Sequence, residues 1–139
     1  MDGLYPAQSL DKQYGDIKIL DALGSGSPFF GKLEERMQLI QKGNYLQSLN
    51  DYYKSGVQIG YRNLENATRK MEAELNEMRE PRKNFVIAVT HDVNVASFLA
   101  GKHVVGEFAL DTWPHYLDAA VIIRRGREDA FGYFRWNLL

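Results

Sequence analysis

The chain has 139 residues, of which 45% are hydrophobic and 25% are charged, as in a folded domain of ordinary size. Lys and Arg number 17 against 18 Asp and Glu, and this balance argues against nucleic-acid binding. The absence of cysteine excludes disulfides and Cys-based metal sites. The sequence has no apolar run near the roughly 18 residues of a membrane helix, and no signal-peptide pattern opens it. We therefore expect no membrane partner, and either a cytoplasmic protein or one whose export signal has been removed.

Residues 1–30 are expected to be irregular, because glycines and prolines interrupt any helical run. The run Gly-Ser-Gly-Ser-Pro at residues 24–28 has two interpretations, a phosphate-cradling loop or a plain loop. It lacks the Lys-Ser/Thr ending of a P-loop and follows no clear strand, so the plain loop is favoured.

Three helices are predicted in the following part of the chain. The first covers residues 32–42, with Leu33, Met37 and Ile40 (and Leu39) on one side and Gly43 as its cap. The second is indicated by Leu46, Leu49 and Tyr53. The third runs from Leu64 to about Glu80, before Pro81, and its apolar face comprises Leu64, Ala67, Met71, Leu75 and Met78.

Residues 45–61 are rich in tyrosine: Tyr45, Tyr52, Tyr53 and Tyr61. A surface that stacks nucleic-acid bases is one interpretation. Because no basic residues flank the cluster, core or interface packing is favoured.

A continuous apolar run at residues 85–89 predicts a strand that is buried on both faces. Thr90, His91 and Asp92 follow at once, and residues 93–100 resume helical spacing up to Gly101. The chain then ends in a predicted hairpin with strands at residues 117–123 and 130–136, joined by residues 124–129. The three arginines in this connection could hold an anion, but a solvated tip is the favoured interpretation.

The strand–turn–helix unit around His91 is the candidate site. Open α/β folds place ligands where a buried parallel strand meets a helix start, and free N–H groups there favour an anion. His91 would add a donor, and Asp92, once protonated beside a phosphate, could pass its proton to a leaving alcohol. The competing interpretation is that Asp92 or Thr90 caps the helix and that His91 is a satisfied buried histidine.

Residues 85–101 resemble the second motif of the histidine acid phosphatases, an apolar strand followed by a His-Asp pair and a helix. The run His91-Asp92-Val93-Asn94 is similar to the branch of bacterial phytases and sugar phosphatases, in which any residue and then Asn follow the pair. Trp113-Pro114-His115-Tyr116 resembles the family's aromatic-Pro segment before its next strand. The resemblance extends over residues 64–136.

This resemblance implies an α/β fold of the three-layer phosphoglycerate-mutase type and the hydrolysis of phosphate monoesters through a phosphohistidine. It gives His91 and Asp92 catalytic roles, as phosphate ligand and proton donor, and makes Thr90 and Asn94 candidate substrate-binding residues. It implies a phosphorylated small molecule as the partner, no cofactor and no metal, and a periplasmic or secreted location. We place this family-like region at residues 31–139.

The family's nucleophile lies in an Arg-His-Gly motif, and this sequence has no such triplet. Of the other histidines, His103 follows a helix and His115 lies in a Pro-containing turn, and the spacing of the three histidines matches no standard metal site. We therefore expect the nucleophile to belong to a part that precedes residue 1, and the isolated chain to be inactive. Two alternatives stay open: a non-catalytic module that binds a phosphorylated ligand or a partner, and the phosphoglycerate mutase branch, against which the aspartate counts.

The chain is also expected to form a homo-oligomer. A strand at residues 85–89 without its neighbour would expose an apolar edge, and the hairpin carries many aromatic residues. The alternative is that residues 17–20 fold back and pair with this edge as a substitute strand.

Overall fold

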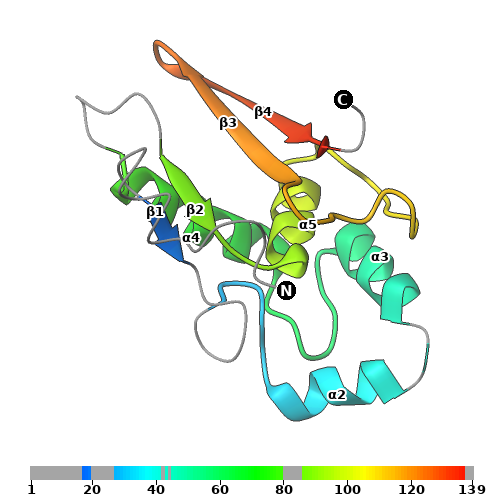
Figure 1. Ribbon diagram of the computed structural model, residues 1–139. Coiled ribbons are helices and arrows are strands. Elements are labelled where there is room, and N and C mark those ends of the chain that lie inside the picture. Colours follow the sequence, from blue (N-terminus) through cyan, green and yellow to red (C-terminus); the bar gives the residue numbers. More distant parts are fainter. Residues whose placement is uncertain (1–16, 20–26, 42, 44, 80–85, 137–139) are drawn as a thin grey trace.

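The computed structural model describes residues 17–19, 27–41, 43, 45–79 and 86–136 (Figure 1). The elements in chain order are β1 (Ile17–Ile19), α2 (Leu33–Gln41), α3 (Tyr45–Ser55), α4 (Leu64–Glu77), β2 (Ile87–Val89), α5 (Asp92–Gly101), β3 (Ala119–Arg125) and β4 (Glu128–Phe134). Helices mixed with a parallel and an antiparallel strand pair agree with the predicted α/β class. None of the helices in the described ranges is long and apolar enough to cross a membrane.

Helix α5 lies at the centre of the packing. Its residues Ala96, Phe98, Leu99 and Ala100 are all buried, and so are its polar residues Asn94 and Ser97. It packs against α3, α4 and β3, and the Phe98 ring meets Phe131 of β4 edge to face at 6.2 Å. The helix that begins at the candidate site is therefore held from several sides.

The predicted packing of α3 and α4 is confirmed. Tyr52, Tyr53 and Tyr61 are buried in one cluster, so the tyrosine-rich segment belongs to the core. Leu64 and Met71 of α4 are buried as the periodicity predicts. Asn63 caps this helix by accepting the N–H of Asn66.

The prediction for α2 is wrong about the face that it buries. Leu33, Met37 and Ile40 are exposed, whereas Arg36 and Leu39 are buried. The guanidinium of Arg36 lies 4.2 Å from the centre of the Phe30 ring, a favourable cation–π contact. Gly60 adopts a positive φ against the backbone of Arg36, where a Cβ would come within 2.8 Å of the Arg36 nitrogen. The approach of this distant loop decides which face of α2 is covered.

The hairpin is confirmed, but its predicted connection at residues 124–129 is wrong. Arg124 pairs with Asp129 and Arg125 with Glu128 within the ladder, so only Gly126 and Arg127 form the turn. Gly126 has a φ of 62°, which a two-residue hairpin turn favours. Opposite charges across the strands extend the ladder, and Arg124 Nε donates to Asp129 Oδ1 at 3.0 Å.

Strand β1 corrects the expectation that residues 1–30 are irregular. Residues 17–19 pair in parallel with residues 87–89, as the fold-back alternative expects, and residue 20 lies outside the described residues. Phe29 and Phe30 also belong to the core, so residues 27–30 are part of the packed unit. The predicted oligomer stays a prediction.

Strand β2 is shorter and less buried than predicted. Residue 85 lies outside the described residues, and Ile87–Val89 is only partly buried, with Val89 37% exposed. The prediction of burial on both faces is wrong, because in the described part of the chain β1 is the single strand beside β2. A strand with one neighbour leaves side chains open to solvent.

The contact between α4 and α5 gives a first prediction. A Cβ on Gly101 would lie 1.9 Å from Oγ1 of the buried Thr68. We expect Gly101→Ala to lower the free energy of unfolding by about 1–3 kcal/mol, because the two helices must move apart. Urea denaturation measures this change, and Gly106→Ala is the control, since a Cβ there meets nothing within 4 Å. Equal stability of the two variants would contradict the prediction.

Candidate functional site

His91 and Asp92 lie together between the end of β2 and the first turn of α5, as predicted. Val89 ends the strand, His91 is the N-cap residue in an extended conformation, and Asp92 begins the helix. The His91 side chain is exposed and makes no capping hydrogen bond. The interpretation of His91 as a buried histidine is therefore wrong, and the predicted cleft beside the pair stays a prediction.

The Asp92 carboxylate is exposed, but both of its oxygens accept a hydrogen bond. Oδ1 accepts the backbone N–H of Val93 at 2.8 Å, and Oδ2 accepts the indole Nε1–H of Trp113 at 2.8 Å. These two hydrogen bonds hold the carboxylate in one orientation. Asp92 thus accepts a backbone N–H in the first turn of α5 and at the same time accepts a side-chain hydrogen bond from Trp113, which is distant in the sequence.

Asn94 and Thr90 form a polar group beneath the His-Asp pair. Asn94 is fully buried, its Nδ2 donates to Thr90 Oγ1 at 2.8 Å, and its Oδ1 accepts from Ser27 Oγ at 2.6 Å. Both ends of the amide are therefore engaged within the protein. In this structure Asn94 positions Thr90, and the predicted substrate contacts of the two residues stay predictions.

Trp113 was not singled out as a site residue from the sequence, although its segment carries part of the family resemblance. Its ring meets Phe108 edge to face at 5.5 Å, and Phe108 is buried. Asn50 of α3 fixes the backbone of Phe108 at two points, because its Nδ2 donates to the Phe108 carbonyl at 2.7 Å and its Oδ1 accepts the Phe108 N–H at 2.9 Å. Trp113, which donates to Asp92, therefore packs on the hydrophobic core through Phe108.

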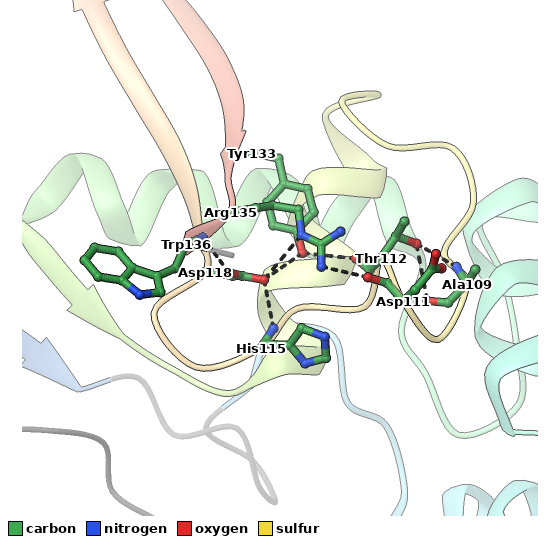
Figure 2. A network of polar contacts seen from close by, with 8 residues as sticks. All are labelled: Ala109, Asp111, Thr112, His115, Asp118, Tyr133, Arg135 and Trp136. Atoms are coloured by element: carbon green, nitrogen blue, oxygen red, sulfur yellow. Dashed lines mark hydrogen bonds and ion pairs between the residues drawn. The ribbon is translucent and has the colours of Figure 1, made fainter. Parts of the chain in front are cut away.

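A second group of polar contacts connects residues 109–118 to the end of the hairpin (Figure 2). The Asp118 side chain is fully buried and accepts the backbone N–H groups of His115 and Trp136, both at 3.0 Å. Arg135 lies 3.5 Å from the same carboxylate and donates to the carbonyl of Asp111 at 2.8 Å. The segment between Phe108 and Asp118 is thus fixed at both ends.

The surroundings shift the pKa of two groups in this network. Burial opposes the ionisation of Asp118, but the backbone donors of His115 and Trp136 and the charge of Arg135 outweigh it, so the pKa of Asp118 lies below its usual range. Burial, followed by the charge of Asp118, raises the pKa of Tyr133 to about 12. At neutral pH Asp118 is therefore ionised and Tyr133 is a neutral donor, and the Tyr133 hydroxyl donates to the Thr112 carbonyl at 3.1 Å.

The side chains of the remaining histidines are exposed, and neither belongs to the His91–Asp92 pair. His103 follows α5 with a φ of 59°, and His115 holds Asp118 through its backbone N–H. Within the described ranges, no group of three or more His, Cys, Asp or Glu side chains is placed to hold a metal ion.

No family model, curated protein or solved structure matches the chain.

The low pKa of Asp118 predicts a pH dependence of stability. Because its pKa is lower in the folded chain, ionised Asp118 stabilises the protein above the unfolded value of about 3.9, and this contribution is lost as the pH falls through the folded value. We expect Asp118→Asn to unfold at a lower urea concentration than the wild type at pH 7. Between about pH 5 and about pH 3 the variant should lose less of its free energy of unfolding than the wild type does. Asp111→Asn is the control, since Asp111 contributes its carbonyl. Parallel acid profiles for wild type and Asp118→Asn would contradict this assignment.

A further prediction contrasts Asn94, the buried residue of the site, with Asp92, an exposed one. Asn94→Ala leaves Ser27 and Thr90 without a buried partner, so we expect it to lower the free energy of unfolding by about 1–3 kcal/mol. Asp92→Asn changes an exposed side chain and should alter stability by less than about 0.5 kcal/mol. Chemical denaturation of both variants tests the contrast, and a larger loss for Asp92→Asn would reverse these assignments.

Proposed function

We propose that the chain is the C-terminal part of a histidine acid phosphatase, with His91 as a phosphate ligand and Asp92 as the proton donor. The observation that carries this proposal is the placement of both exposed side chains at the start of α5, directly after β2. The resemblance of residues 64–136 to that family supplies the identity of the reaction.

The geometry supports phosphate binding in two ways. The positive end of the α5 helix dipole lies at His91 and attracts an anion, although Asp92 Oδ1 already accepts the N–H of Val93 and the His91 carbonyl accepts those of Asn94 and Val95. The exposed His91 ring can add a hydrogen bond, with a positive charge when it is protonated. A dianionic phosphate beside Asp92 would in turn favour the protonated carboxyl.

In the proposed reaction, a histidine from a preceding part of the protein attacks phosphorus and the bond to the ester oxygen breaks. Asp92 gives its proton to that oxygen, so an alcohol leaves and the carboxylate remains. Water then attacks the phosphohistidine, Asp92 accepts a proton from it, and phosphate is released. Within the chain, His91 would hold the phosphoryl oxygens throughout, and no metal or cofactor enters these steps.

The wider assignments belong to the same proposal. They comprise a three-layer fold of the phosphoglycerate-mutase type, a phosphorylated small molecule as substrate, a periplasmic or secreted location and a homo-oligomer. A non-catalytic module that binds phosphorylated ligands is the second candidate, because the sequence has no Arg-His-Gly motif. The two candidates share the phosphate-binding step and differ in turnover.

Phosphate binding is the first test. We expect inorganic phosphate to cause saturable shifts in the ¹H–¹⁵N signals of residues 91–95 in the isolated chain. His91→Ala should weaken this binding at least about tenfold, because a hydrogen bond to a charged group is lost. His103→Asn is the matched control, since His103 is exposed, lies beyond the other end of α5 and has a positive φ that Asn tolerates. Absence of saturable shifts, or equal weakening in both variants, would contradict the proposal.

Turnover is the second test. We expect the isolated chain to show no hydrolysis of an aryl phosphate above the background rate, because the nucleophile is missing from its sequence. Hydrolysis that disappears in His91→Ala or Asp92→Ala would show that the chain carries a complete site of its own.

A further inference from the structure

Arg36 is a buried charge that the proposed chemistry does not use. Helix α2 lies away from the β3–β4 hairpin (Figure 1), and Arg36 is on its buried side, with 7% of the residue exposed. Its Nε and Nη2 atoms are buried and have no hydrogen-bond partner in the part of the chain that the structure describes. A buried cation whose N–H groups lack acceptors is costly, so this position calls for an acceptor.

The contact with Phe30 satisfies only one face of the guanidinium. Its central carbon lies 4.2 Å from the centre of the Phe30 ring, which attracts the positive charge. The N–H groups, however, lie in the plane of the guanidinium and need acceptors at its edges. Nε–H and one N–H of Nη2 point the same way, and together they match the two oxygens of one carboxylate. The two nitrogens without a partner are therefore the pair that forms one bidentate edge.

The surrounding chain holds Arg36 in place. Gly60 has a φ of 80° and lies so close that a Cβ there would come 2.7 Å from Arg36 Cγ. The Gly60 carbonyl accepts the N–H of Gly31 at 2.8 Å, and Phe30 pairs with Tyr61 in a β-bridge. A guanidinium fixed between these two segments is preorganised for an anion, because little side-chain freedom is lost when the anion binds.

Two tyrosines add neutral donors to this charge. Burial raises the pKa of Tyr61 and the charge of Arg36 opposes this rise, so the guanidinium lies within electrostatic range of the hydroxyl. The hydroxyls of Tyr61 and Tyr45 share one hydrogen bond at 2.5 Å, and this bond uses one of their two protons. One positive charge beside neutral hydroxyls suits a monoanionic carboxylate better than a dianionic phosphate.

We propose that Arg36 is the binding site of a small carboxylate, which accepts two parallel hydrogen bonds from Nε and Nη2. Because both nitrogens lie below the surface, only a small molecule reaches them, and its entry requires the loop between Gly56 and Gly60 to open. Both of these glycines have a positive φ, and glycine changes its backbone conformation at low cost. The inference does not depend on the proposed phosphatase function, which uses His91 and Asp92.

The first test follows the Nε–H signal of Arg36 in ¹H–¹⁵N spectra of the wild type. Sodium acetate replaces sodium chloride at constant ionic strength, and we expect a saturable shift of this signal. Arg36→Lys keeps the charge but loses the planar fork. Its acetate affinity, followed through the backbone signals of residues 57–61, should therefore be weaker at least about tenfold.

Urea denaturation gives a second measurement. Arg36→Met removes the charge but keeps a flexible stem, so in chloride it should unfold at the same urea concentration as the wild type or at a higher one. The midpoint in acetate minus the midpoint in chloride should be smaller for Arg36→Met than for the wild type, because the specific site is gone. Arg62→Met is the matched control, since Arg62 is an exposed arginine just beyond the same loop, and it should keep the wild-type difference.

Each outcome decides for or against the carboxylate site. A saturable shift together with an acetate effect that requires Arg36 supports it. An Arg36 signal that acetate leaves in place, or an equal acetate effect in the wild type and Arg36→Met, overturns it. A large loss of stability in Arg36→Met in chloride would show that the guanidinium already has its acceptor, and would overturn it as well. Equally strong binding of inorganic phosphate would contradict the choice of a carboxylate.

Discussion

The buried amide of Asn94 is the contact on which the geometry of the site depends. A side-chain amide inside an apolar helix is costly unless both of its ends are hydrogen-bonded. Asn94 meets this condition by binding Ser27 on one side and Thr90 on the other. The two bonds fix the chain before α2 and the turn after β2 relative to α5. The positions of His91 and Asp92 follow from this, because these two residues connect Thr90 directly to the first turn of α5.

The sequence predicted those elements whose burial is decided locally. The apolar face of α4, the helical spacing of residues 93–100 and the tyrosine-rich core all follow from spacing and composition. The prediction failed for α2, where a loop around Gly60 packs on the Arg36 side and leaves the apolar side exposed. The expectation of irregular structure failed for β1, because residues 17–19 become a strand by pairing with a partner some 70 positions away. The fold-back alternative, in which this segment covers the edge of residues 87–89, is the one that the register confirms.

The candidate site divides in the same way. His91 and Asp92 could be found from the sequence, because a polar pair between an apolar run and a helix is a local pattern. Their supports could not: Asn50 acts on Phe108 across 58 positions, and Trp113 acts on Asp92 across 21. Neither residue type marks such a role by itself. Only the aromatic-Pro segment, noted for its resemblance, pointed to the right part of the chain.

The two aspartates at the ends of this arrangement differ in their surroundings, and the difference suits Asp118 to a structural role and Asp92 to the proposed chemical one. Asp118 is closed off from solvent and accepts two backbone donors beside an arginine, so a proton can reach it only by breaking the network. Its low pKa expresses that cost. Asp92 also accepts two hydrogen bonds, but its carboxylate is open to solvent. An acid–base group needs a defined orientation together with access to a proton, and Asp92 has both, whereas Asp118 has only the first. The segment between them links the two aspartates, because Asp118 accepts the N–H of His115 at one end and the Trp113 indole donates to Asp92 at the other.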